Sequence, residues 1–227
     1  MVLLSALKRF KNMTLIIFGI YLLNPMHTTI SGYILLGGKS SRMGKPKHLI
    51  EIGGRTMLDR TTEALMPVCS AVYTVGDDAN DADSLANFPD DKSPNAGAAG
   101  PLVGMYTALK NCETEWAAIL ACDFPFASKD LFETLIGKVS DELDAIVPVQ
   151  PDGRLQPLMG LYRRSSCLEV AELSLRSGKF SMGGMLDRVR LRKVGFEELA
   201  ELAGSELLFR NINTPQDLHD AEALMSR

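Results

Sequence analysis

LLGGKSSRMGKPK, residues Leu35 to Lys47, is the stretch that decides the fold. It contains three glycines, one arginine and three lysines, and it follows directly on the apolar run Tyr33–Leu36. Paired glycines let backbone N–H groups come close to phosphate oxygens, and arginine and lysine side chains neutralise phosphate charge. A strand that runs into such a loop predicts a phosphate-binding site in an α/β domain.

Two common phosphate loops are excluded by the spacing. In the Walker A motif four residues separate the glycines and a hydroxyl residue follows the lysine, whereas Gly38 and Gly44 enclose five residues and Pro46 follows Lys45. The dinucleotide fingerprint G-x-G-x-x-G is also absent. The loop therefore favours neither an NTP hydrolase nor an NAD or FAD enzyme.

The composition sets further bounds. A chain of 227 residues with 46% hydrophobic and 23% charged residues can bury a sizeable core. The net charge of −4 argues against a nucleic-acid binder that relies on overall basicity. Four cysteines without a C-x-x-C pair give no support for a zinc or redox site, and they suit a reducing cytoplasm. The three histidines are too scattered to form a metal set.

Residues 1–29 are expected to be an N-terminal extension that need not belong to the fold. A basic flank and the apolar run MTLIIFGIYLL resemble a signal peptide, but no A-x-A-like cleavage site follows. The apolar run is also about half as long as a bilayer span. We favour a translation start at Met26 or a lead without function, and membrane attachment or export are the alternatives.

Short apolar runs alternate with segments of helical spacing beyond Met26. The runs predict strands at 33–36, 71–75, 116–121, 145–149, 155–162, 191–194 and 207–211. The spacing predicts helices at 57–68, 102–109, 129–139, 168–175, 182–189 and from 215 onwards, with Ser128 and Thr214 as N-caps. We expect residues 30–227 to form a single α/β domain, three-layered and Rossmann-like, with a mostly parallel sheet and ligands at the carboxyl ends of its strands.

The whole of Leu35–Lys47 resembles the signature loop of the nucleotidyltransferases of the molybdenum cofactor family, the MobA-like NTP transferases. The family pattern is roughly L-[AL]-[GA]-G-x-[SA]-x-R-[MF]-G-x-x-K, and this chain fits every fixed position. The resemblance continues through CDFP at Cys122–Pro125, GPLVG at Gly100–Gly104, QPLMGLY at Gln156–Tyr162 and NINTPQDL at Asn211–Leu218. It covers nearly all of residues 31–226.

The resemblance implies a catalytic set and a magnesium ion. Arg42 and Lys47 would neutralise the triphosphate, and Asp123, after a buried strand, would bind Mg²⁺ and act in catalysis. Residues implied in nucleotide binding are Leu36, Gly37, Gly38, Ser40, Lys47, Asp90, Asp91, Gly100, Pro101 and Asp123. Residues implied on the acceptor side are Gln156, Lys179, Asn211 and Asn213, with the two asparagines near the acceptor or the metal.

The implied reaction transfers GMP from GTP–Mg²⁺ to the terminal phosphate of molybdenum–molybdopterin cofactor and releases pyrophosphate. Gly37-Gly38 is the guanylyltransferase form, because a missing Cβ beside the base leaves room for a purine. In contrast, Gly44-Lys45-Pro46-Lys47 resembles the form of the cytidylyltransferases.

Other functions stay open at this point. They are a CTP-dependent molybdopterin cytidylyltransferase, a nucleotidyltransferase with another small acceptor, and a nucleotide-binding regulator without catalysis. The intact set of Arg42, Lys47 and Asp123 argues against a regulator. The expected partners are GTP, molybdenum–molybdopterin cofactor, and the molybdoenzymes or insertion chaperones that receive the product, without nucleic acid or a membrane.

Overall fold

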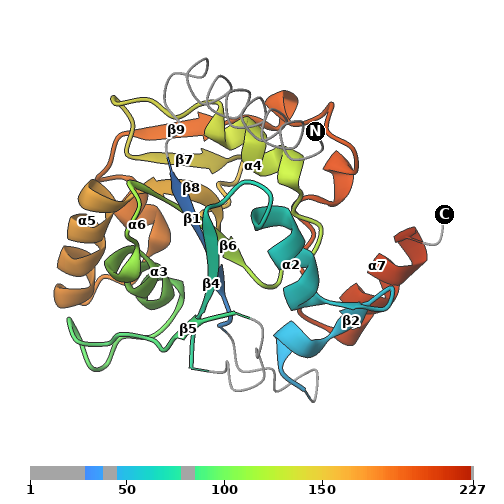
Figure 1. Cartoon of the computed structure of the whole chain (residues 1–227), viewed down its shortest axis with the longest axis horizontal. Coiled ribbons are helices and arrows are strands. Elements are labelled where there is room, and N and C mark those ends of the chain that lie inside the picture. Colours follow the sequence, from blue (N-terminus) through green and yellow to red (C-terminus); the bar gives the residue numbers. More distant parts are fainter. Residues whose placement is uncertain (1–28, 38–44, 78–84, 226–227) are drawn as a thin grey trace, which may run out of the picture.

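The computed structural model describes residues 29–37, 45–77 and 85–225 of the chain. Seven strands form one sheet in the order β5-β4-β1-β6-β8-β7-β9 (Figure 1). Their bounds are β1 Ile30–Leu35, β4 Ala71–Val75, β5 Asn87–Phe88, β6 Trp116–Ala121, β7 Ala145–Pro148, β8 Met159–Arg163 and β9 Leu191–Val194. Every strand pairs in parallel with its neighbours except β8, which is antiparallel to β6 and β7. The predicted α/β fold with a mostly parallel sheet is confirmed.

Helices cover both faces of this sheet, which gives the three predicted layers (Figure 1). The helices are α2 Met57–Leu65, α3 Pro101–Asn111, α4 Lys129–Ile136, α5 Arg164–Arg176, α6 Met182–Leu186 and α7 Pro215–Met225. One apolar core contains side chains of α2, α4 and α7, and the other contains those of α3, α5 and α6. None of the helices in the described part of the chain is both long and apolar enough to cross a membrane.

The central strands are apolar along their whole length because both of their faces are covered. In β6, Trp116, Ala118 and Leu120 enter one core, while Ala117 and Ile119 enter the other. A strand with a solvated face would alternate with polar residues instead. The run WAAILA therefore predicted both the bounds of this strand and its central place.

Local signals also explain how two helices begin. Ser128 caps α4 by accepting a hydrogen bond from the backbone N–H of Leu131 at 3.2 Å. Thr214 accepts one from the N–H of Asp217 at 3.2 Å, at the start of α7. Both caps confirm the sequence prediction.

One predicted strand, 207–211, is wrong. The chain forms a short 3-10 helix, η3 (Ser205–Leu207), and then continues without a strand. Leu208 and Ile212 are fully buried in the core, which explains the apolar pattern. The backbone, however, finds no neighbouring strand, and the N–H of Ile212 donates to the carbonyl of Asp123 at 3.0 Å instead. The strand prediction was wrong because the side chains of this segment are buried while its backbone has no neighbouring strand to pair with.

A small hairpin was missed. Strands β2 (Glu51–Ile52) and β3 (Arg55–Thr56) pair in antiparallel fashion around Gly53-Gly54. Both glycines have positive φ, 59° and 76°, as the mirror-image turns of two-residue hairpins require. The Gly-Gly dipeptide was the signal that could have predicted this turn.

Candidate functional site

The site lies where the neighbouring strands β1 and β6 end, near the middle of the sheet (Figure 1). Leu35 at the end of β1 is in register with Ala121 at the end of β6, and the N–H of Cys122 donates to the carbonyl of Leu35 at 3.1 Å. The segments that follow, Leu36-Gly37 and Cys122-Asp123, therefore leave the sheet side by side. The carboxyl edge of a parallel sheet is the usual place for a ligand in such a fold.

Three side chains from distant parts of the chain meet beside these strand ends. Lys47 begins the 3-10 helix η1 (Lys47–Leu49), Asp123 follows β6, and Asn213 precedes α7. The Nζ atom of Lys47 lies 3.8 Å from Oδ2 of Asp123 and donates a hydrogen bond to Oδ1 of Asn213. The structure thus brings the predicted catalytic residues Lys47 and Asp123 together with a residue predicted on the acceptor side.

Burial makes the Asp123 carboxylate a costly charge. Its side chain is one-quarter exposed at 25%, and its Oδ1 atom is buried with no hydrogen-bond partner among the described residues. Burial raises the pKa of Asp123, and the nearby ammonium of Lys47 opposes this effect only partly. A buried carboxylate oxygen without a partner is a group that a cation would stabilise.

These donors fit a magnesium ion. Mg²⁺ prefers oxygen ligands, and it usually takes one or two from protein side chains and the rest from water and phosphates. Here the carboxylate of Asp123 and the amide oxygen of Asn213 face the same ammonium group. Within the described residues no group of three or more His, Cys, Asp or Glu side chains could hold a metal by itself. The donor set therefore suits an ion that arrives with its nucleotide.

The segment after β1 offers free space. Leu36 is buried, and its N–H donates to the carbonyl of Val75 at 2.8 Å, so the strand direction continues for one more residue. Gly37 is exposed, and a Cβ atom added there would meet no other atom of the described residues within 4 Å. Space beside the backbone of Gly37 is what the predicted contact with a purine base requires.

The glycine-rich loop before α3 lies next to the end of β1. Gly100 has a φ of 100° and a ψ of −175°, a conformation that is almost restricted to glycine, and Pro101 takes the first helical position. A Cβ atom on Gly104 would lie 3.5 Å from the side chain of Leu35 and 3.9 Å from Oδ1 of Asp90. The first turns of α3 are therefore packed against Leu35 of β1 and close to Asp90.

The structure separates the two aspartates whose register was ambiguous. The Asp91 carboxylate pairs with Lys110 at 2.5 Å and accepts the N–H of Ser93 at 2.8 Å. These bonds, that from Lys110 first, lower the pKa of Asp91 to about 2. Asp90 instead lies close to Gly104, and its N–H donates to Asp77 at 3.1 Å. Asp91 is thus tied to α3, and Asp90 is the better placed of the two for a nucleotide contact.

The predicted acceptor residues occupy different places. The segment of Gln156 lies beside the end of β6, because the N–H of Ala121 donates to the carbonyl of Leu158 at 2.8 Å. Lys179 is exposed after α5, and Asn211 is exposed on the segment that leads to Asn213. Within the described residues, Gln156, Lys179 and Asn211 make no hydrogen bond or ion pair with the side chains of Lys47 or Asp123, so their roles stay predictions.

Several predicted residues lie outside the described ranges. These are Gly38, Ser40 and Arg42 of the glycine loop, together with residues 1–28 of the N-terminal extension. The described part of that loop begins again at Lys45 and leads into η1.

The sequence missed one function of Asp217. Besides the N–H of Thr214, which a helix cap explains, its Oδ2 atom accepts the N–H of Asn213 at 3.0 Å. An aspartate at the third helical position was a signal for a cap. Nothing in the sequence indicated that the same carboxylate holds a residue of the site.

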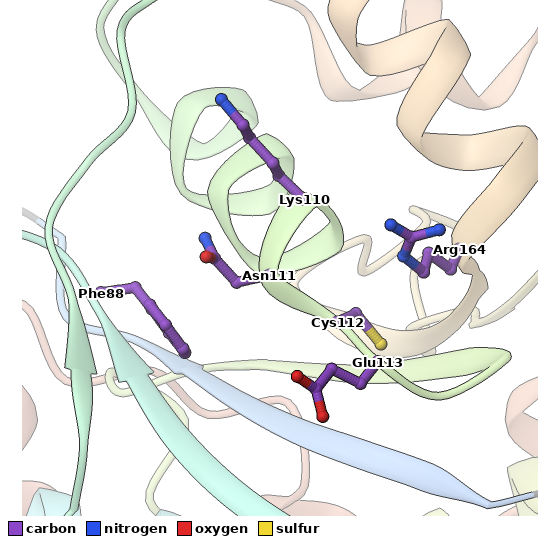
Figure 2. A pocket seen from close by; sticks show the side chains of 6 residues that line it. All are labelled: Phe88, Lys110, Asn111, Cys112, Glu113 and Arg164. Carbon is purple, nitrogen blue, oxygen red and sulfur yellow. The ribbon is translucent and has the colours of Figure 1, made fainter.

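A cavity in the described part of the chain lies elsewhere (Figure 2). It has a volume of about 520 Å³ and is lined by Phe88, Lys110, Asn111, Cys112, Glu113 and Arg164. Lys110 is already paired with Asp91, and the Asn111 amide donates to the carbonyl of Thr107 at 2.8 Å. Because its polar groups are partly engaged and none is a predicted site residue, we place the site at Lys47 and Asp123.

The sequence of the chain is similar to those of known proteins of one family. The family model described as the MobA-like NTP transferase domain matches residues 32–193. A curated relative from Desulfosudis oleivorans, named molybdenum cofactor guanylyltransferase, is 32% identical over 203 residues, which are 86% of this chain and 95% of that protein. A relative from a Geobacillus species, named probable molybdenum cofactor guanylyltransferase, is 30% identical and covers 84% of this chain and 97% of its own length.

Solved structures support the fold. The molybdopterin-guanine dinucleotide biosynthesis protein A of Archaeoglobus fulgidus aligns with a TM-score of 0.72 at 24% identity, covering 86% of this chain and 98% of that one. The 2-C-methyl-D-erythritol 4-phosphate cytidylyltransferase of Thermus thermophilus aligns with a TM-score of 0.61 at 18% identity, covering 86% and 98%. At these identities the likeness concerns the fold alone.

Proposed function

The chain belongs to the MobA-like NTP transferase family, and from that premise we propose that it transfers GMP from GTP–Mg²⁺ to the terminal phosphate of molybdenum–molybdopterin cofactor. The observation that carries the proposal is the meeting of Lys47, Asp123 and Asn213 where β1 and β6 end. The names of the relatives from Desulfosudis and Geobacillus support guanine as the base.

The reaction is a substitution at the α-phosphorus of GTP. An oxygen of the acceptor phosphate forms the new P–O bond, and the bond from the α-phosphorus to the bridging oxygen of the β-phosphate breaks. The electron pair leaves with pyrophosphate. Because a phosphate monoester is already anionic, the protein needs no general base, and catalysis rests on positioning and charge neutralisation.

The chain's own residues supply that neutralisation. Lys47, which is only 18% exposed, would stabilise the negative charge that develops on the departing pyrophosphate, and Arg42 would share this task. Asp123 and Asn213 would hold the magnesium ion. When bound, that ion would supply positive charge that stabilises the phosphate oxygens. The pairing of Lys47 with Asp123 and Asn213 keeps the ammonium in the site before the nucleotide arrives.

Nucleotide recognition is assigned to the two glycine-rich segments. Leu36 and Gly37, with Gly38 and Ser40, would contact the nucleotide from the end of β1. Gly100 and Pro101 would contact it from the start of α3, and we assign Asp90 rather than Asp91 to the sugar or base, because Asp91 is paired with Lys110. The open space at Gly37 supports GTP.

The CTP-dependent reaction is the second candidate. It is favoured by one feature, the stretch Gly44-Lys45-Pro46-Lys47, which resembles the cytidylyltransferase form. This chain aligns with nearly the whole length of two relatives that are named for guanylyl transfer. We therefore rank GTP first.

The acceptor would be bound from the opposite side of the nucleotide phosphates. The N–H of Gln156 donates to the carbonyl of Pro148 at the end of β7, and Lys179 and Asn211 lie on exposed segments that could contact the pterin or its phosphate. We place the reaction in the cytoplasm, because all four cysteines are free thiols and three of them are buried. The product would pass to molybdoenzymes or to cofactor-insertion chaperones.

A melting series with each nucleotide tests the choice of substrate. Ligands that bind the native state raise the melting temperature, and the rise grows with the logarithm of the ratio of ligand concentration to Kd once the ligand is in excess. We expect GTP with Mg²⁺ to raise it more than CTP, ATP or UTP do, and chelation of Mg²⁺ to reduce the GTP effect. Protection by CTP without protection by GTP would overturn the guanylyl assignment.

A further inference from the structure

We propose that Asp217 is a positioning residue of this site, which acts by fixing the backbone of Asn213 so that its side chain meets Lys47 and Asp123. The inference rests on the proposed function, because it concerns the same site. Asp217 lies on α7 and touches none of the groups that would react, so it acts only through Asn213.

The carboxylate of Asp217 makes two backbone contacts with a single oxygen. Its Oδ2 atom accepts the N–H of Asn213 at 3.0 Å and that of Thr214 at 2.8 Å. Thr214 returns a bond, since its Oγ1 atom accepts the N–H of Asp217 at 3.2 Å. The bonds from the Asn213 segment lower the pKa of Asp217, so the carboxylate is ionised and a strong acceptor at neutral pH.

One of these contacts exceeds what a helix cap needs. A capping box consists of the reciprocal bonds between the cap residue, here Thr214, and the residue at the third helical position, here Asp217. The bond to Asn213 reaches the residue before the cap and closes no part of the helix. It fixes instead the backbone that carries the amide side chain of the site.

A second anchor holds the other side of Asn213. Ile212 is fully buried, and its N–H donates to the carbonyl of Asp123 at 3.0 Å. Asn213 is therefore held between an anchor on the backbone of Asp123 and an anchor on α7. Lys47 then donates to Oδ1 of Asn213. Loss of the Asp217 anchor would let this amide oxygen move, and a shift of about 1 Å in a catalytic site can cost about 100-fold in rate.

The test compares four variants of the full chain. Asp217→Ala removes the anchor and the cap, Thr214→Ala removes the cap hydroxyl and leaves the carboxylate, and Asp217→Glu keeps a carboxylate. Asp220→Ala is the matched control, because Asp220 lies on the same helix and its carboxylate accepts bonds from Arg210 and Gln216 rather than from the Asn213 segment.

We expect Asp217→Ala to lower kcat for guanylyl transfer by about 10- to 100-fold and to raise the Mg²⁺ concentration needed for half-maximal rate, with little change in KM for GTP. Thr214→Ala should lose a similar amount of melting temperature but keep kcat within about twofold of wild type, since it leaves the bond to Asn213 intact. Asp217→Glu should recover much of the rate, and Asp220→Ala should match wild type. Equal kcat losses in Asp217→Ala and Thr214→Ala, or none in Asp217→Ala, would contradict the positioning role.

A second measurement does not depend on the reaction. Acetylation of Lys47 by acetic anhydride, followed by mass spectrometry, reports how firmly its ammonium is held. We expect Lys47 to react several-fold faster in Asp217→Ala than in Asp220→Ala. If wild type transferred no nucleotide but this difference appeared, the proposed function alone would fail. If the acetylation rates were equal, the positioning role would fail whatever the enzyme does.

Discussion

At the scale of single residues, Asp123 carries a conflict between stability and function. Its carboxylate is largely buried, one of its oxygens has no partner among the described residues, and burial raises its pKa. A buried charge that is only partly compensated destabilises the native state, and such strain is typical of functional sites. A ligand that supplies positive charge would relieve it.

Asp123→Asn is therefore expected to raise the melting temperature at pH 7.5 while it abolishes turnover. The asparagine keeps the shape and the bond between Asn213 and Lys47, but it removes the costly charge and the predicted metal ligand. Calorimetry without nucleotide measures the first effect, and a pyrophosphate-release assay measures the second. A variant that melts well below wild type, or that still turns over at more than about one-hundredth of the wild-type rate, would contradict this role of Asp123.

Gly37→Ala separates nucleotide choice from stability. An added Cβ meets no atom of the described residues within 4 Å, so the free energy of unfolding should change by less than about 0.5 kcal/mol. The same methyl group would project toward the predicted base site and should shift the preference from GTP toward CTP. The ratio of kcat/KM for the two nucleotides measures this shift. An unchanged ratio would show that Gly37 does not contact the base.

At the scale of elements, the start of α3 depends on one glycine. Gly100 has a φ of 100° and a ψ of −175°, where a side chain is strained although space is available. We expect Gly100→Ala to lower the free energy of unfolding by about 1–3 kcal/mol, because residues other than glycine rarely adopt this conformation. Urea denaturation measures the loss, and Gly37→Ala is the control. Loss of less than about 0.5 kcal/mol would indicate that the loop adapts.

The elements that the sequence predicted best are those in which side-chain pattern and backbone partner agree. The run Trp116–Ala121 is a strand with the predicted bounds, since both cores require its apolar faces and strands lie on either side of it. The segment 207–211 has a similar pattern, but its backbone makes local turn bonds, such as that from the N–H of Arg210 to the carbonyl of Leu207. An apolar pattern reports burial, and only the three-dimensional arrangement decides whether a ladder partner is present.

At the scale of the whole molecule, the site unites segments that are far apart in the chain. Lys47 and Asn213 are 166 residues apart, yet they share a hydrogen bond. The sequence could predict a role in the site for each of them, because each lies in a motif that resembles one of the family's. It could not predict their contact, since that depends on α7 returning to the edge of the sheet beside η1. The same limit explains why the hydrogen bond between Asp217 and the backbone of Asn213 could not be predicted.

Asp144, which directly precedes β7, forms a half-buried ion pair with Arg190, and the contribution of this pair to stability should depend on pH. The side chain of Asp144, which is only 7% exposed, accepts bonds from the Arg190 guanidinium at 2.8 Å and 2.9 Å. The pKa of Asp144 is held well below its usual range, first by the hydrogen bond from Arg190. Asp144→Asn should therefore lower the free energy of unfolding at pH 7 by about 1.5 kcal/mol, at the low end of bonds to charged groups because Arg190 is solvent-exposed.

The pH dependence follows from the lowered pKa. The stabilisation is fully present above the pKa of the unfolded aspartate, about 3.9, and is lost as the pH falls from there toward the folded value. The difference between wild type and Asp144→Asn should therefore be constant from pH 7 to pH 5 and should shrink below about pH 4. Urea denaturation at each pH measures it. A difference that grew on acidification would contradict the assignment of the ion pair.

Transfer of a labelled nucleotide tests the proposed function most directly. Purified protein is incubated with Mg²⁺, molybdenum–molybdopterin cofactor and GTP or CTP labelled at the α-phosphate, and the product and pyrophosphate are separated and counted. We predict that label from GTP appears in a guanine dinucleotide form of the cofactor, with one pyrophosphate released for each transfer, and that Asp123→Asn gives neither. Label transferred from CTP but not from GTP, or pyrophosphate released from GTP without any labelled cofactor, would contradict guanylyl transfer to this acceptor.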